Sequence, residues 1–275
     1  MNYDFVVWDP LTNEKHRLPR PSPPPTAFNS NVAVLCAATA EGCDHGACHS
    51  GPFLVAFIWS NSTGLLDPKV TYARVYSSVT GDWSEPSSVQ HPHASLEMTK
   101  PSCPTRLVGD KLYFSCLFRY NFMYELDAQR LSVILPPPLP LYKRHPLFNV
   151  MYIEDDGLGC VEVEKEPRPC LRLWSRVTAA NGDGVACWER GRVIELETLL
   201  PDGALLAQQL ASDSSTPNRI LGFAEGTDVV FVGIHTLDHL GAVYMVQHNS
   251  GRAKKLFDKG TLVVAYTSFC IPVID

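Results

Sequence analysis

The stretch VTYARVYSSVTGDW, residues 70–83, decides the fold class. Its first seven residues are rich in β-branched and aromatic side chains, which favour strands. Side chains along such a strand alternate between two faces, which here carry Val70, Tyr72 and Arg74 and, opposite them, Thr71, Ala73 and Val75. Thr-Gly-Asp at residues 80–82 predicts a turn, and Trp83 follows it. The stretch is therefore a strand that ends at a tight turn.

Similar units recur along the whole chain, each with a turn, short apolar strands and an aromatic marker. Tyr76, Tyr124 and Trp174 lie 48 and 50 residues apart, and Tyr244 follows after 70 more residues. A period of about 40–50 residues with four strands is typical of a β-propeller blade. The pattern predicts an all-β chain folded as a β-propeller of about five to six four-stranded blades, a number that allows for an incomplete ring. A large β-sandwich with irregular spacing is the alternative.

Composition supports an all-β globular chain and excludes several other classes. The 275 residues include 22 prolines and 18 glycines, which punctuate the sequence too often for long helices. Apolar residues make up 45%, which is too much for intrinsic disorder. The net charge of −6 argues against nucleic-acid binding, because a phosphate backbone selects clustered cations. We expect one domain over residues 1–275, with no nucleic-acid or membrane partner.

The cysteines and the N-terminus predict an intracellular protein, cytoplasmic or nuclear. The nine cysteines are an odd number, and several lie within apolar runs, as Cys116 does. No basic segment precedes an apolar stretch at the N-terminus, so we expect no secretory signal. Reduced cysteines that act as small apolar side chains fit this pattern best.

Four strings resemble, in their order and spacing, the strand and turn segments of plant F-box-associated β-propellers. They are residues 7–14 (VWDPLTNE) with the Leu-Pro at 18–19, residues 75–83 (VYSSVTGDW), residues 109–114 (GDKLYF) and residues 131–136 (LSVILP). The resemblance runs from about residue 3 to residue 258. The most similar group is the F-box proteins of grasses, whose architecture is similar to that of kelch-type F-box proteins.

This resemblance implies a protein-interaction module and not an enzyme. Relatives of this kind carry an N-terminal F-box, which binds the Skp1 adaptor, and the propeller recognises the substrate of an SCF-type ubiquitin ligase. No F-box is visible in this sequence, so Skp1 and cullin are expected only if an F-box is supplied elsewhere. The alternative is a propeller that binds its protein partner as a decoy or scaffold, without Skp1. Ring closure is expected from pairing of residues 5–8 with residues 262–266.

One loop carries residue types that could bind a metal. Cys43, His45, Cys48 and His49 offer four ligands within seven residues, which suits zinc. The spacing is poor, however, because structural zinc sites draw ligand pairs from separated knuckles. A polar loop between two strands is the favoured interpretation, and no cofactor is predicted.

Two acidic segments are the candidates for a propeller hydrolase, the third hypothesis. Residues 154–156 (EDD) precede a glycine and read as a turn. Residues 161–166 (VEVEKE) alternate apolar and acidic side chains and predict an exposed outer or edge strand. A glycosidase needs two carboxyl groups across a pocket, and adjacency in sequence does not place them there. We assign no catalytic or cofactor-binding residue.

Overall fold

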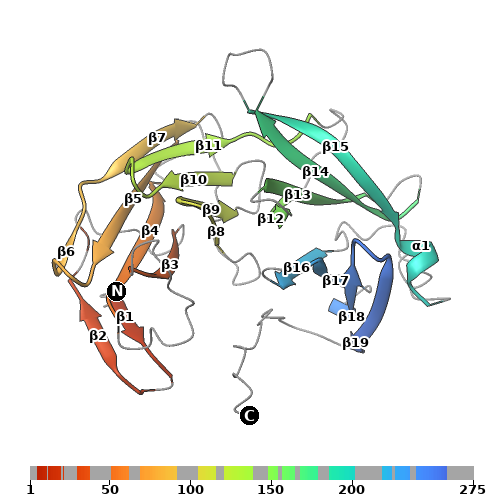
Figure 1. The fold of residues 1–275 in the computed structure, drawn as a ribbon, viewed down its shortest axis with the longest axis horizontal. Helices are drawn as coiled ribbons and strands as arrows, with labels where there is room; N and C mark the ends of the chain where they lie inside the picture. Colours follow the sequence, from red (N-terminus) through yellow and green to blue (C-terminus); the bar gives the residue numbers. More distant parts are fainter. Residues whose placement is uncertain are drawn as a thin grey trace, which may run out of the picture. The chain divides into compact units, whose positions relative to one another are not determined.

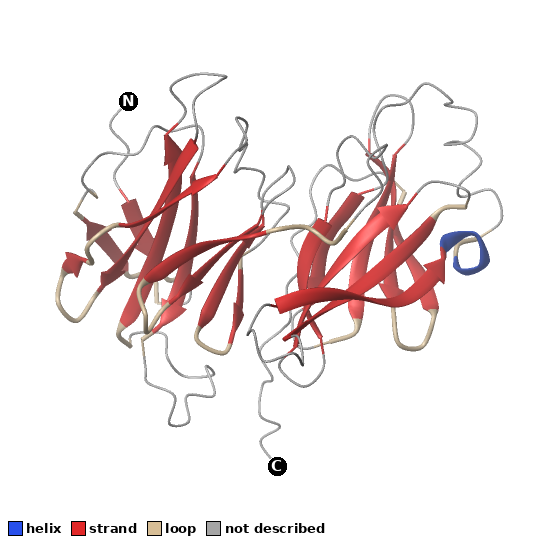
Figure 2. Ribbon diagram, turned by 90° about the horizontal axis from the view of Figure 1, so that it is seen from above, coloured by secondary structure: helices blue, strands red, loops and turns tan. Residues whose placement is uncertain are grey.

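In the computed structural model, the described part of the chain consists mainly of antiparallel strands (Figures 1 and 2). The structure describes residues 5–10, 12–19, 21, 30–37, 51–61, 69–91, 105–115, 121–138, 148–153, 157–164, 168–178, 186–201, 219–224, 227–235 and 240–258. Within these ranges, the helical structure is limited to the single turn α1 (Leu196–Leu199). The prediction of an all-β chain is confirmed.

Contacts divide the chain into two compact units. The first comprises Met1–Thr99, Met123–Val133 and Ser268–Asp275, and the second comprises Lys100–Phe122 and Ile134–Thr267. In the first unit, β1 (Phe5–Trp8) and β2 (Lys15–Leu18) form a two-stranded sheet. A larger sheet has the order β3-β4-β5-β6, with β7 also paired to β5. Its strands are β3 (Ser30–Cys36), β4 (Phe53–Asn61), β5 (Lys69–Ser77), β6 (Asp82–Trp83) and β7 (Ser87–His91).

Three further sheets each contain four antiparallel strands in chain order. The first of them consists of β8 (Arg106–Val108), β9 (Lys111–Ser115), β10 (Asn121–Glu125) and β11 (Arg130–Ile134). The second consists of β12 (Phe148–Ile153), β13 (Gly157–Glu164), β14 (Cys170–Thr178) and β15 (Ala186–Glu195). The third consists of β16 (Arg219–Ala224), β17 (Val229–His235), β18 (Leu240–Gln247) and β19 (Arg252–Phe257).

The core of the first unit is aromatic. Phe57 and Trp59 of β4 stack with ring centroids 5.3 Å apart, and Phe5 of β1 meets Phe57 edge-on at 4.9 Å. The indole Nε1 of Trp83 donates to the carbonyl oxygen of Pro19 at 2.8 Å. A two-stranded sheet is marginal by itself, so these contacts explain how β1 and β2 are held against the larger sheet.

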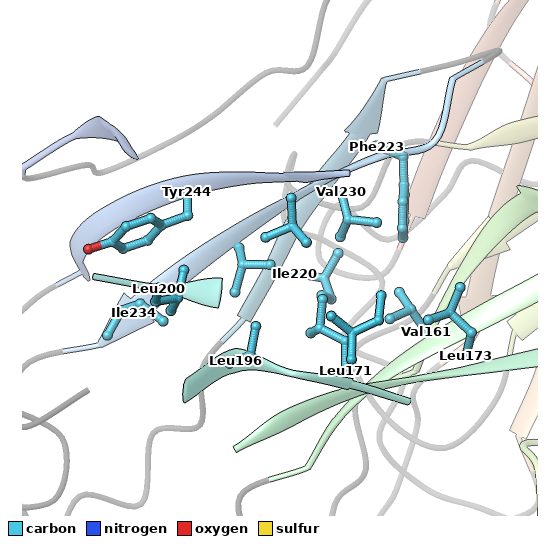
Figure 3. Close-up of a cluster of buried hydrophobic side chains, with 13 residues drawn as sticks. Val161, Leu171, Leu173, Leu196, Leu200, Ile220, Phe223, Val230, Ile234 and Tyr244 are labelled. Carbon is cyan, nitrogen blue, oxygen red and sulfur yellow. The ribbon is translucent and has the colours of Figure 1, made fainter. Parts of the chain in front are cut away.

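The core of the second unit is mainly aliphatic and joins two sheets (Figure 3). From β13 to β15 it receives Val161, Leu171, Leu173 and Ile194, and α1 adds Leu196. The sheet β16–β19 supplies Ile220, Phe223, Val230, Val232, Ile234, Tyr244 and Val246. Burial of this apolar surface is the main stabilising term for the pair of sheets.

The predicted turns are confirmed where the structure describes them. Gly81, Gly109 and Gly251 have φ angles of 73°, 59° and 65°, a backbone region that glycine adopts without strain. Each ends or begins a strand: Gly81 lies between β5 and β6, Gly109 before β9 and Gly251 before β19.

One strand prediction is wrong. Residues 161–164 were expected on an exposed outer or edge strand, but they lie in β13, between β12 and β14. Val161 is fully buried and Glu162 is only 2% exposed. Alternation of acidic and apolar residues does not exclude an inner strand when a neighbouring strand supplies a cation. Arg172 of β14 is that cation: it lies directly opposite Glu162 and forms an ion pair with Glu164, the next acidic residue of β13. Residues 262–266, expected to close a ring, lie outside the described residues.

Candidate interaction face

The two faces of the sheet β12–β15 differ in chemistry. Leu171 and Leu173 of β14 point into the aliphatic core. The alternate residues, Arg172, Trp174 and Arg176, belong to the opposite face because successive side chains of a strand alternate. On that opposite face we define the arginine–tryptophan face as Arg176, Trp188, Arg190 and the neighbouring Leu135.

Two cross-strand pairs build this face. Trp174 lies opposite Arg190, and Arg176 lies opposite Trp188. The Arg190 guanidinium carbon is 5.5 Å from the Trp174 ring centroid, and that of Arg176 is 5.9 Å from the Trp188 ring. Trp174 is 2% exposed, whereas Arg190 is exposed. Attraction between each cation and the facing ring orders both arginines.

Trp188 is fixed in place by a hydrogen bond. Its indole Nε1 donates to the carbonyl oxygen of Leu135 at 2.9 Å. Leu135 itself is 63% exposed, so its backbone holds an exposed apolar residue within hydrogen-bond reach of the half-buried indole. The face therefore combines two cations with an ordered aromatic ring and an aliphatic side chain.

A β-bulge makes this arrangement compatible with the core. Arg172 pairs with Val193, but Trp174 pairs with Arg190, so β15 spans three residues where β14 spans two. Without the extra residue, Ile194 would fall on the same face as Arg190. With it, Ile194 lies opposite Leu171 and is buried in the core. Gly191 fits here because a Cβ would lie 3.2 Å from the Leu173 carbonyl oxygen.

Arg192, in the bulge, ties the sheet to its neighbour. Its Nη1 donates to the carbonyl oxygens of His248 and Asn249, both at 2.8 Å. These carbonyls belong to the turn between β18 and β19. Arg192 thus uses its guanidinium to hold two sheets together, whereas Arg176 and Arg190 contact only rings among the described residues.

Arg172 is neutralised by a two-point ion pair. Its Nε and Nη2 donate to the two carboxylate oxygens of Glu164 at 3.0 and 2.8 Å. The hydrogen bond to Glu164 raises the pKa of the Arg172 guanidinium. Among the residues that the structure describes, no carboxylate forms an ion pair with Arg176 or Arg190.

Two cysteines on the same sheet are held as neutral thiols. Burial, and then the negative charge of Glu164, raise the pKa of Cys170 from 9.0 to about 11. Burial and the charge of Glu162 raise the pKa of Cys160 still further. Because the thiolate is the reactive form, both side chains act as packing groups.

The acidic candidates do not form a two-carboxyl site in the described residues. Glu164 is committed to Arg172, and Glu162 is buried in β13. Residues 154–156 lie outside the described residues, as do Cys43, His45, Cys48 and His49. Over the described ranges there is no cluster of three or more residues that could hold a metal ion.

Sequence reasoning missed a buried polar row in the first unit. The Ser60 and Thr71 hydroxyl oxygens are 2.5 Å apart, and the Thr71 hydroxyl is 3.0 Å from the His91 Nε2. All three side chains are at most 3% exposed. A hydroxyl beside an imidazole is the arrangement of an activated nucleophile, but burial closes this one to a substrate. The row therefore links β4, β5 and β7.

It also missed the arginine–tryptophan face, although a signal was present. Residues 172–176 (RLWSR) and 188–190 (WER) place arginine and tryptophan at alternate positions of successive strands. What the sequence could not show is the register that pairs each arginine with the opposite ring.

No known protein-family model and no curated protein matches this sequence. None of the helical structure in the described part is long and apolar enough to span a membrane.

Proposed function

We propose that this chain is a protein-interaction module with a β-propeller fold, in which each four-stranded sheet is one blade. The support is the succession of antiparallel sheets in chain order and the period of about 50 residues in the sequence. An experimental structure with these sheets around one axis would support the propeller, and a pair of stacked sheets would contradict it.

The observation that carries the interaction function is the arginine–tryptophan face. Tryptophan and arginine are the side chains most enriched at the energetic centres of protein interfaces. Here both are ordered before any partner arrives, which lowers the entropy cost of binding. By its resemblance, the module recognises the substrate of an SCF-type ubiquitin ligase. It holds its partner near the enzyme and breaks no bond itself.

The test is affinity capture of the full chain from its native cell extract, scored for Skp1, cullin and other bound proteins. Parallel captures use Trp188→Ala and a matched variant elsewhere, Phe257→Ala, whose side chain is 54% exposed. We expect partners that are retained by Phe257→Ala and lost by Trp188→Ala. Skp1 and cullin among the captured proteins would support the ligase role.

Other outcomes separate the alternatives. Partners without Skp1 would favour a decoy or scaffold that binds the same proteins without delivering them. Identical captures from both variants would contradict the arginine–tryptophan face as the interface. No specific observation favours the hydrolase, because Glu162 is buried and Glu164 is paired with Arg172.

A further inference from the structure

We infer that the arginine–tryptophan face binds an extended acidic segment of a partner protein. Two carboxylates of this segment pair with Arg176 and Arg190, and a flanking apolar side chain packs on Trp188 and Leu135. The inference rests on the proposed function, since it assumes that a protein is bound there, and it adds the chemistry of that protein.

The first argument is charge. The chain carries a net charge of −6, and the sheet neutralises Arg172 with Glu164. Arg176 and Arg190 are left as cations whose only partners in the described residues are rings. A guanidinium that stacks on a ring uses its flat side for that contact, and its N–H groups, which lie in the guanidinium plane, stay free to bond elsewhere. Those N–H groups are the donors that match a carboxylate in two-point geometry.

The second argument is spacing. Arg176 lies opposite Trp188 and Arg190 lies opposite Trp174, so the two arginines are diagonal neighbours across the strand pair. Diagonal positions are about 7–8 Å apart. Residues i and i+2 of an extended chain are about 6.5 Å apart and point to the same side. Two carboxylates at i and i+2 of an extended segment therefore reach both guanidinium groups together.

The third argument is the apolar surface beside the cations. Trp188 is anchored through its Nε1, and Leu135 remains 63% exposed next to it. Contact with this surface excludes water around the charged pairs, which strengthens them. An acidic segment with an adjacent leucine or phenylalanine thus fits better than a purely acidic one.

The experiment measures binding of a labelled peptide by fluorescence anisotropy. The probe is fluorescein–Gly-Leu-Glu-Ser-Glu-Ser-Leu-Gly, and its counterpart carries glutamine in place of both glutamates. The full chain is compared with Arg176→Gln, Arg190→Gln and the double variant. The matched control is Arg252→Gln with Lys254→Gln, which removes two cations from exposed positions of β19.

We expect each single arginine variant to weaken binding about tenfold, as the loss of one charge-assisted contact implies, and the double variant and the glutamine peptide, which lose both contacts, to weaken it about a hundredfold. The control should change affinity less than about twofold. Arg190→Lys should restore part of the affinity, because it keeps the charge without the planar fork. Circular dichroism of each variant confirms that the sheet is intact.

Equal binding by the double variant and the unmodified chain would overturn the inference, as would equal affinity for both peptides or no binding at about 1 mM probe. Failure here is distinct from failure of the proposed function. If Trp188→Ala still abolishes capture of a partner, the face remains an interface and only its acidic chemistry is wrong. If the probe binds through the arginines but Trp188→Ala captures the same proteins as the unmodified chain, the preference for an acidic segment is supported and the proposed function is contradicted.

Discussion

The sheets β3–β7 and β12–β15 share an antiparallel order but use their polar side chains in opposite ways. In the first, the central strand β4 is buried on both faces, and Ser60, Thr71 and His91 form a closed hydrogen-bonded row inside the unit. In the second, one face is aliphatic, and the other carries Arg176 and Arg190 at partly or fully exposed positions. The hydroxyl groups of the first sheet's row bond to each other and to His91, whereas the Arg176 and Arg190 side chains of the second sheet reach the surface.

The difference shows that the strand pattern and the polar chemistry of each sheet are set by different residues. Both sheets are built from antiparallel strands that bury apolar side chains, and either set of polar side chains is compatible with that arrangement. What separates them is the second face of the central strands: hydroxyl and imidazole groups in one case, guanidinium and indole groups in the other. Four substitutions test this contrast, in order of decreasing expected effect.

The largest effect is expected from the aliphatic face of β14. Leu171 is 1% exposed within the core that joins two sheets. Leu171→Ala should lower the free energy of unfolding by about 3 kcal/mol, because it removes buried apolar contact and leaves a cavity. Urea denaturation measures the change. Val79→Ala, at a side chain that is 73% exposed, is the control and should cost less than about 0.5 kcal/mol.

The buried polar row should give the next largest effect. Thr71→Val keeps the branched shape but removes the hydroxyl between Ser60 and His91. Two buried polar groups then lose a partner, and we expect a loss of about 2 kcal/mol in the free energy of unfolding. Thr80→Val, in an exposed turn, is the matched control. A loss no larger than that of the control would show that the row does not stabilise the sheet.

A smaller effect is expected from the bulge that separates the two faces of the second sheet. Gly191→Ala places a Cβ 3.2 Å from the backbone oxygen of Leu173, which cannot move away as a flexible side chain would. We expect a loss of about 1 kcal/mol in stability, together with weaker binding of the acidic probe, since Arg190 is the preceding residue. Glu189→Ala, at an exposed position of the same strand, should change neither. Unchanged stability and affinity in Gly191→Ala would show that the bulge does not position Arg190.

The sequence predicted the all-β class and most strands because local patterns carry that information. The run at residues 70–76 became β5, and the glycine turns before β6, β9 and β19 were recognised from their residue types. The sequence-based prediction of exposure was wrong at Glu162, because its burial depends on the position of β13 within its sheet. Sequence reasoning also failed at Trp174 and Arg190, because their contact follows from a bulge that shifts the register by one residue. The register between β14 and β15, and not strand propensity, pairs Arg176 with Trp188 and Arg190 with Trp174.

The smallest effect concerns the thiols of Cys160 and Cys170, which lie on the same side of the sheet as Trp174. The pKa of Cys170 is raised from 9.0 in the unfolded chain to about 11 by burial and by the charge of Glu164. The folded state therefore holds its proton more tightly, and this stabilisation is fully present below pH 9. It is lost as the pH rises through about 11, so the unfolding free energy should fall between these values.

Urea midpoints of the unmodified chain and of Cys170→Ala at pH 8, 9, 10 and 11 measure this loss, and the variant should show a shallower decline. Alkylation by iodoacetamide at pH 8, read by peptide mass spectrometry, gives an independent check. The exposed Cys187 should react well before Cys170 or Cys160, which are buried. Equal rates would contradict the burial of the two thiols and with it the register that pairs β13 with β14. If the urea midpoints of the two proteins instead declined in parallel with pH, Cys170 would have the same pKa in the folded and unfolded states. The charge of Glu164 would then act on Arg172 and not on Cys170.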